Sequence, residues 1–202
     1  IPQTRVDYVV RVDHIGDPRG IVSGTTTITK DPVGLVIARS AAQVIEASGL
    51  LKNGFSFQTG AGGASLAAAK FVGQAMKRDG IVGSFIMGGI TAYLVEMLNQ
   101  GLFRKIIDVQ DFDLDAVRSL AANPNHVEVS AGLYASPFNS GCVVNQLDTV
   151  ILGATEIDTD FNVNVVTGSD GTIMGGSGGH SDAAAGAKLT IIVATLLRGR
   201  LP

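Results

Sequence analysis

Glycines gathered at the ends of short apolar runs are the feature that most constrains this chain. The sequence has 26 glycines among 202 residues and no tryptophan. They do not recur at every third position, which excludes a collagen triple helix. They cluster at residues 60–63, 88–89, 175–176 and 178–179. Glycine lets a strand end in a sharp turn and lets the backbone approach a ligand closely. The clusters therefore predict an open α/β sheet with a binding site along one edge.

The segments between the clusters show strand and helix patterns. Apolar and β-branched runs predict strands at residues 1–12, 25–28, 54–59, 81–87, 106–109, 143–144, 149–153, 161–166 and 173–174. Helical periodicity and capping residues, Ser65 among them, predict helices over the second half of residues 32–47 and at residues 65–78, 91–100, 114–122 and 182–197. We expect one α/β domain, an open mixed sheet flanked by helices. The strand-rich middle of the chain argues against a plain doubly wound parallel sheet.

Charge and cysteine content narrow the possible classes. A formal net charge of −3 provides no basic surface for nucleic acid. No apolar run approaches the ~18 residues of a membrane span. No signal peptide opens the chain, so the cytoplasm is the expected location. A single cysteine, Cys142, excludes an internal disulfide and any cysteine-based zinc site. The first residue is not methionine, which suggests a fragment or a processed piece.

The first glycine cluster is a candidate anion site. Gly60, Ala61, Gly62 and Gly63 follow a predicted strand and open a predicted helix. Such a turn presents free N–H groups and the positive end of a helix to an anion. The spacing matches neither a dinucleotide fingerprint nor a P-loop. The alternative is a tight turn that packing requires.

The last glycine cluster has the same context. Gly178 and Gly179 precede His180, Ser181 and Asp182 at the start of a predicted helix. His180 is placed to meet a ligand carboxylate or a thioester carbonyl, although a lone histidine is more often structural or solvated. Ser181 or Asp182 can instead cap the helix. Valine at Gly178 or Gly179 is expected to reduce activity and to leave folding mostly intact.

Three polar residues in the strand-rich region are weaker candidates. Glu156 follows a mostly apolar run, so its carboxylate is either solvated at the sheet edge or placed in a site. Asn162 and Asn164 are two residues apart and face the same side of a strand. They could bind a polyanionic ligand or face solvent on an edge strand.

The remaining histidines and acidic residues carry no predicted site. His14 and His126 lie in polar turns and are expected to be solvated. The acidic residues from Asp108 to Asp115 lack the turn glycine and terminal glutamate of a calcium loop. They are interpreted as helix caps and a solvated face. No three His, Cys, Asp or Glu residues show metal-ligand spacing, so no metal site is predicted.

Several segments resemble the alpha-subunit family of citrate lyase, whose members are citrate CoA-transferases. The matching segments are residues 101–110, 112–120, 123–126, 156–159, 161–165, 167–171 and 178–182. The resemblance covers essentially the whole chain. It implies the fold of the sugar-phosphate isomerase and CoA-transferase group. It also implies that residues 1–202 are a single C-terminal domain of a longer two-domain subunit, with the N-terminal half absent.

The resemblance implies a reaction and partners. Acetyl-acyl-carrier-protein and citrate would give citryl-acyl-carrier-protein and acetate, and a separate lyase subunit would cleave the citryl group. The partners would be the N-terminal half, the acyl carrier subunit and the lyase subunit, in an oligomeric complex. The thioester would be carried by a CoA-derived prosthetic group on the carrier, with no cofactor bound tightly to this chain. Neither nucleic acid nor membrane is an expected partner.

The resemblance also implies how transfer proceeds. Many related CoA-transferases carry a nucleophilic glutamate on the strand that aligns with residues 81–89, where this chain has Phe85 and no carboxylate. Phenylalanine cannot form a covalent enzyme–CoA thioester. Citrate's own carboxylate would therefore attack the acetyl thioester in a ternary complex and form a mixed anhydride.

The glycine clusters and their polar neighbours would then share the work. Gly88, Gly89 and residues 60–63 would supply N–H groups to the oxyanion. Residues 178–179 would let the backbone approach pantetheine, and residues 180–181 would orient a carboxylate. Glu156 would be a wall of the site or a residual acid.

Two other hypotheses about the function remain open. A non-catalytic sensor of the same fold would bind a small anion such as a sugar phosphate in the same loops. A scaffold domain would leave the chemistry to the missing half or to partner subunits, although its many glycine loops count against pure scaffolding. The ligand separates these readings, since the transferase requires a thioester and citrate.

Overall fold

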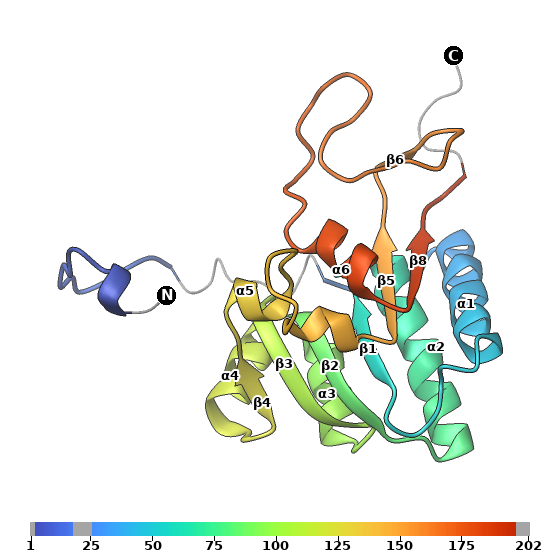
Figure 1. Cartoon of the computed structure of the whole chain (residues 1–202), viewed down its shortest axis with the longest axis horizontal. Coiled ribbons are helices and arrows are strands. Elements are labelled where there is room, and N and C mark those ends of the chain that lie inside the picture. The colour runs from blue at the N-terminus through green and yellow to red at the C-terminus, as the bar shows by residue number, and fades with distance from the viewer. Residues whose placement is uncertain (1–2, 18–25, 197–202) are drawn as a thin grey trace.

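The computed structural model describes residues 3–17 and 26–196, and a six-stranded sheet forms its centre (Figure 1). The strands are β1 (Ser56–Thr59), β2 (Gly83–Ile90), β3 (Phe103–Asp111), β4 (His126–Glu128), β5 (Thr149–Gly153) and β8 (Leu189–Val193). Their order is β4-β3-β2-β1-β5-β8, and every neighbouring pair is parallel. The carboxyl ends of all six strands therefore lie along one edge.

Helices cover both faces of the sheet. One face packs against α1 (Pro32–Ala47), α2 (Gly63–Asp79), α3 (Ala92–Asn99) and α4 (Leu114–Ala122). The other packs against α5 (Ala131–Tyr134), the 3-10 helix η4 (Val143–Gln146) and α6 (His180–Gly186). Each face has its own cluster of buried apolar side chains, the larger beneath α1–α4. None of the helices in the described residues is long and apolar enough to cross a membrane.

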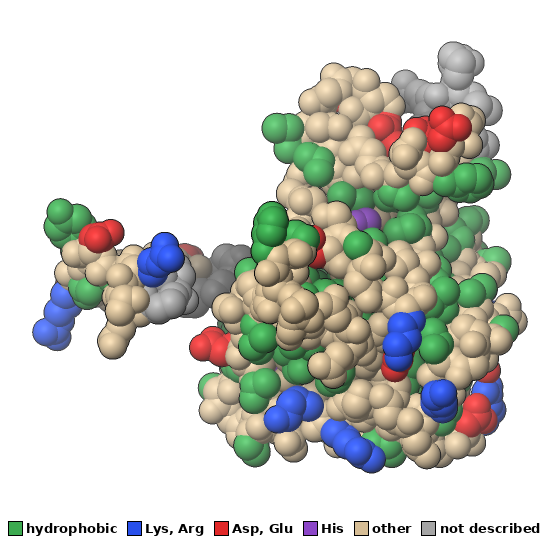
Figure 2. Space-filling view, viewed as in Figure 1, with side chains coloured by type: hydrophobic (Ala, Val, Ile, Leu, Met, Phe, Trp, Pro, Cys, Tyr) green, Lys and Arg blue, Asp and Glu red, His purple; other side chains and the backbone are tan. Residues whose placement is uncertain are grey.

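Two segments project from this body. A short antiparallel ribbon of β6 (Glu156–Ile157) and β7 (Val163–Asn164) stands beyond the carboxyl edge and continues into a long loop (Figure 1). Residues 3–17, which include the 3-10 helix η1 (Gln3–Arg5), extend to the side of the body and are exposed. Both segments carry exposed hydrophobic side chains (Figure 2).

The predicted α/β class, an open sheet flanked by helices, is confirmed. Helix α4 has the predicted bounds, and α2 and α3 begin and end within two residues of theirs. Helix α1 begins at Pro32 and fills the whole of residues 32–47, of which only the second half was predicted to be helical. The argument against a parallel sheet is wrong for the main sheet. Among residues 3–17 and 26–196, antiparallel pairing is confined to the β6–β7 ribbon and an isolated bridge between Thr167 and Ile173.

Several predicted elements are wrong. Residues 6–12 and 26–28 form no strand, and residues 143–144 belong to η4; residues 1–2 and 18–25 lie outside the described part. The predicted helix at residues 182–197 is α6 followed by β8, because residues 189–193 pair along the whole of β5. Ser65 lies inside α2, whose N-cap is Gly62.

Strand β2 does not end at its two glycines but runs through them. The register with β3 shifts between Gly88 and Gly89, and Gly88 has φ 103°, which favours glycine. A Cβ at Gly88 would lie 2.9 Å from the Gln58 side chain, and one at Gly89 would overlap the Phe112 ring. Both glycines are therefore required by packing, whatever else they do.

Replacing Gly89 with alanine should destabilise the fold. The added methyl group would displace the Phe112 ring, and overpacking of this kind costs about 1–3 kcal/mol. Gly175→Ala is the matched control, because no atom lies within 4 Å of its added Cβ. Urea unfolding of both variants checks the prediction, and equal midpoints would contradict it.

Candidate functional site at the carboxyl edge of the sheet

The carboxyl edge has a switch point between β1 and β5. After β1 the chain crosses to β2 on one side, whereas β5 and β8 lie on the other side. Open parallel sheets bind ligands in the crevice at such a point. The turn after β1 starts there, where the Gly60 N–H donates to the Ile151 carbonyl oxygen at 2.7 Å. The fold thus brings the first predicted glycine loop to the expected place.

A small cavity lies at this point. Its volume is about 150 Å³, and uncharged residues of α1, α2 and the ends of β5 and β8 line it: Gly34, Ile37, Gly62, Gly63, Ala64, Ser65, Gly153, Ala154, Val193, Ala194 and Thr195. The first N–H groups of α2 have no helical partners, and the helix dipole is positive at that end. The cavity is smaller than the ~300 Å³ of a typical ligand pocket. It suits one carboxylate or carbonyl group.

His180 is held beside this cavity by a hydrogen bond. Its Nε2 lies 2.8 Å from the carbonyl oxygen of Gly153, one of the lining residues. A carbonyl only accepts, so Nε2 carries the proton and Nδ1 is left as an acceptor. The structure therefore links the first and last predicted glycine segments through Gly153.

The glycines before His180 have structural reasons of their own. Gly179 is the N-cap of α6, so the expectation that Ser181 or Asp182 caps this helix is wrong. A Cβ at Gly179 would overlap the Tyr134 ring, and Gly178 has φ 51°. Valine at Gly179 would disturb packing, and valine at Gly178 would strain the backbone, which corrects the expectation of intact folding. Ser181 is exposed.

Sequence reasoning missed Gln58 and Tyr134, whose side chains pack against Gly88 and Gly179. The Gln58 Nε2 donates to Tyr134 Oη at 2.7 Å, and each residue is only 5% exposed. Burial raises the pKa of the Tyr134 hydroxyl, which therefore keeps its proton. Within the described residues, Gln58 Oε1 is buried without a hydrogen-bond partner. The available signal was an amide side chain in the short strand that leads into the first glycine cluster.

The polar residues of the ribbon bond to one another. Glu156 accepts hydrogen bonds from Asn164 Nδ2, at 3.2 Å, and from the Ser169 hydroxyl. Asn162 Nδ2 donates to Asp158 Oδ2 at 2.9 Å. Within the part of the chain that the structure describes, the hydrogen bonds of these side chains stay within the ribbon and its loop and do not reach the glycine segments. Their predicted contact with substrate stays a prediction.

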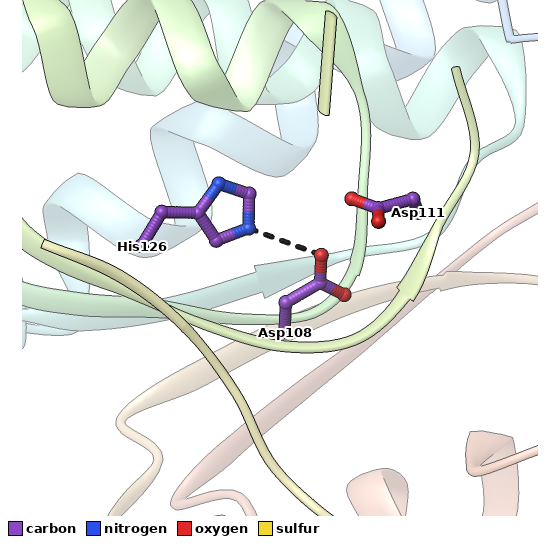
Figure 3. Close-up of side chains that lie close together, drawn as sticks. All are labelled: Asp108, Asp111 and His126. Atoms are coloured by element: carbon purple, nitrogen blue, oxygen red, sulfur yellow. Dashed lines mark hydrogen bonds and ion pairs between the residues drawn. The ribbon is translucent and has the colours of Figure 1, made fainter. Parts of the chain in front are cut away.

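A buried group of two aspartates and a histidine lies between strands β3 and β4 and helix α4. His126 Nε2 is 3.0 Å from Asp108 Oδ2, and its Nδ1 is 2.9 Å from Ser119 Oγ. Figure 3 shows Asp111 beside this pair. His126 and Asp108 are 3% and 2% exposed, so the expectation that they are solvated is wrong.

These three side chains are also possible metal ligands. One ligand atom of each lies within 4.8 Å of the others, a gathering that the sequence spacing did not indicate. The hydrogen bonds from His126 to Asp108 and Ser119 already account for two of the three side chains. The prediction that the chain has no metal site stays a prediction.

The acidic group should make stability depend on pH. Burial and the nearby Asp108 raise the pKa of Asp111 to about 7; Asp113 adds to the rise and His126 opposes it. A carboxyl group with a raised pKa in the folded state stabilises it fully at low pH, and this stability is lost as the pH rises through 7. Stability should therefore fall between pH 5 and pH 8.

Asp111→Asn should remove part of this fall. Asparagine keeps the shape and removes the charge, so we expect the variant to lose less stability than wild type, by on the order of 1 kcal/mol after allowance for partial exposure. Chemical unfolding of the 202-residue chain at both pH values measures this. Asp115→Asn, at an exposed position on α4, is the control; a profile of Asp111→Asn parallel to wild type would contradict the prediction.

The sequence matches one protein family over its whole length. The sequence model described as "Citrate lyase, alpha subunit (CitF)" matches residues 1–202. The citrate lyase alpha chain of Klebsiella pneumoniae is 55% identical over 202 residues, which are 100% of this chain and 40% of that protein. The citrate lyase alpha chain of Escherichia coli (strain K12) is 54% identical over the same shares. The chain thus spans about 40% of the length of these relatives.

Solved structures agree with this match. One, described as the alpha subunit of citrate lyase in complex with citrate from Streptococcus mutans, is 54% identical with a TM-score of 0.93. It covers 100% of this chain and 40% of that chain. The alpha subunit of a malonate decarboxylase from Acinetobacter baumannii is 18% identical with a TM-score of 0.54, covers 76% of this chain and 28% of that chain, and shows a shared fold.

Proposed function

The chain belongs to the citrate lyase alpha-subunit family, and on this premise we propose that it is one domain of a citrate CoA-transferase. The reaction converts an acetyl thioester of the acyl carrier protein and citrate into the citryl thioester and acetate. The observation that carries this proposal is the small uncharged cavity at the switch point, where the N-terminus of α2 can hold one carboxylate or carbonyl oxygen.

This cavity is only part of a citrate site. Citrate carries three carboxylates, yet none of the lining residues is charged and the volume is about 150 Å³. The solved relative described as a citrate complex supports citrate as the ligand, and it is a longer chain. We therefore propose that residues 1–202 are a single C-terminal domain and that the N-terminal half faces the carboxyl edge and supplies cationic side chains.

The transfer needs no nucleophile from the protein. A citrate carboxylate oxygen attacks the acetyl carbonyl, and the carbon–sulfur bond breaks. The carrier thiolate departs, and the product that remains is a mixed anhydride of citrate and acetate. The thiolate then attacks the citryl carbonyl of the anhydride, forms the citryl thioester and releases acetate. Catalysis rests on holding the reactants in line and on N–H groups at the oxyanion.

The side chains of β2 are consistent with this direct route. Phe85 is half-buried and packs with the apolar cluster beneath α5 and α6. No carboxylate occurs in residues 81–89, so this strand offers none for a covalent enzyme–CoA thioester. Direct attack by citrate requires none.

The predicted site residues take different roles in this proposal. Ala61, Gly62 and Gly63 supply N–H groups at the oxyanion. The Gly60 N–H already donates to the Ile151 carbonyl oxygen, so Gly60 contributes the turn that places these groups. His180, held beside the cavity through Gly153, and Ser181, next to it on α6, orient a carboxylate. Roles for residues 88–89, 156, 162, 164 and 178–179 in catalysis or substrate binding remain part of the proposal, beside the structural functions already described.

The expected partners follow from the family. The acetyl and citryl groups travel on a CoA-derived prosthetic group of an acyl carrier subunit, and a lyase subunit cleaves the citryl thioester. The alpha subunit works within an oligomeric complex of these proteins. A narrow neutral edge of glycine and alanine is suited to a thin, uncharged pantetheine chain that carries its acyl group to the cavity.

Transfer and its route can be tested together. The full-length subunit, mixed with acetyl-CoA and citrate, should yield citryl-CoA and acetate by mass spectrometry. A parallel sample treated with borohydride, which traps an enzyme-bound thioester, should keep its activity. Inactivation would overturn the direct route but keep the function. Citrate binding without transfer by the folded subunit would overturn the function and favour a sensor.

Blocking the cavity should reduce transfer. The Cβ of Gly62→Val would lie 3.9 Å from Ser65 Oγ, and Gly62 has φ −68°, so valine enters the cavity without backbone strain. We expect kcat/KM to fall at least ~10-fold because the cavity wall loses room for the reacting group. Gly132→Val, exposed on α5 with no atom within 4 Å of its Cβ, is the control. Equal activity of both variants would remove the cavity from the mechanism.

A further inference from the structure

The buried pair of Gln58 and Tyr134 has hydrogen-bonding capacity that the fold does not use. We propose that this pair binds a secondary amide group of the pantetheine arm that carries the acyl thioester. The proposal rests on the proposed transferase function and adds a donor-binding subsite to it. It assigns a role to Tyr134, which lies against Gly179, and to Gln58, which lies against Gly88.

The chemistry of the pair complements an amide. Tyr134 Oη already accepts from Gln58 Nε2 at 2.7 Å, so its own proton is available to donate. Gln58 Oε1 is buried without a partner within the described residues and is available to accept. One donor and one acceptor on a single hydrogen-bonded pair match the carbonyl oxygen and the N–H of a secondary amide.

The burial of the pair makes this unused capacity informative. Both residues are only 5% exposed, and Tyr134 lies within the apolar cluster beneath α5 and α6. Most buried side-chain acceptors in folded proteins have a partner, and those that lack one call for an explanation. A ligand amide satisfies the pair, whereas a ligand without that group leaves it unsatisfied, which favours the amide.

Only a thin layer of glycine backbone separates Tyr134 from the surface, which is where a narrow ligand would enter. A Cβ at Gly179 would overlap the Tyr134 ring, so backbone rather than a side chain covers the phenol at this point. Gly178, which precedes it, is exposed and has φ 51°. Residues 175–178 are all exposed. The proposal requires this segment to shift so that a thin chain can enter at the carboxyl edge.

Two neighbouring residues connect the subsite to the cavity. Gln58 is two residues before Gly60, where the turn at the switch point begins, and Gly179 precedes His180, which bonds to Gly153. An amide at Gln58 and Tyr134 would therefore place the attached thioester toward the cavity. Citrate has a hydroxyl group but no amide, so the two substrates can be distinguished as the source of the contact.

The test uses the full-length subunit with Tyr134→Phe and Gln58→Met, which keep the approximate size of each side chain. We expect the KM for acetyl-CoA and the Kd for desulfo-CoA, measured by calorimetry, to rise ~10-fold in both variants. The KM for citrate should not change. Tyr93→Phe is the matched control, since Tyr93 is a partly buried tyrosine that packs on the opposite face of the sheet.

A second measurement needs only the wild-type protein and a changed ligand. Two acetyl-CoA analogues each have one amide N–H replaced by an ester oxygen, which removes the donor to Gln58 Oε1. We expect one analogue to bind wild type ~10-fold more weakly than acetyl-CoA and to lose nothing further on Gln58→Met. This result identifies the amide that the pair binds.

Three results would overturn the inference. The first is an unchanged KM for acetyl-CoA in both variants, and the second is a rise in the KM for citrate alone. The third is that the affinity losses caused by each ester analogue and by Gln58→Met are independent, so that their fold-changes multiply. Failure of the proposed function looks different, because wild type would then transfer no acyl group. Desulfo-CoA binding decides the subsite in that case too, since it requires no transfer, and no binding to wild type would overturn it.

Discussion

Strand β1 is held by an apolar cluster on one face of the sheet and by hydrogen bonds to the start of β5. The arrangement of the carboxyl edge depends on this strand. Phe57 in the strand and Phe55 before it stack with Phe103 in the apolar cluster beneath α1–α4, with ring centroids 5.7–6.5 Å apart. Ser56, which alternates with them, donates from its N–H to Asp148 Oδ2 at 2.9 Å and accepts from the Asp148 N–H at 2.8 Å. Aromatic stacking holds β1 on one face, and this pair of hydrogen bonds ties its start to that of β5. The switch point follows, because β1 is fixed between β2 and β5.

The glycine clusters serve this edge in two different ways. Gly62 and Gly63 leave room at the N-terminus of α2, where the cavity lies. Gly88, Gly89 and Gly179 instead receive the side chains of Gln58, Phe112 and Tyr134. Where a neighbouring side chain occupies the position of a glycine's missing Cβ, packing accounts for the glycine. The neighbouring side chain is then the residue whose role must be explained. That reasoning leads from Gly179 to the hydrogen-bonded pair beneath it.

The sequence could predict what depends on local pattern. Helix α4 was found with its bounds because Asp113 caps it, accepting from the Ala116 N–H, and Asn123 and Pro124 end it. Residues 189–193 were assigned to a helix because a short buried strand and a buried helix have the same apolar pattern; pairing with β5 decided between them. His126 was missed for a related reason, since its partner Asp108 lies on another strand and leaves no local signal. Of the site, the glycine loop and His180 were predicted, whereas Gln58 and Tyr134 depend on contacts between distant segments.

The exposed apolar side chains bear on how the proposed site is completed. Tyr8 and Ile15 in the projecting N-terminal segment are 90% and 99% exposed, and Phe161 and Ile173 beyond the carboxyl edge are 84% and 76% exposed (Figure 2). The cavity at the same edge lacks the charges that citrate requires, and the relatives extend well beyond the matched part. Under the proposed function, one further domain seated on this edge would cover Phe161 and Ile173 and bring cations to the carboxylates of citrate. A site divided in this way would also explain why the cavity here is lined by small residues. Under the proposed function, the chain would provide backbone N–H groups at the reacting carbonyl, and selectivity for the acid would come from the domain that faces it.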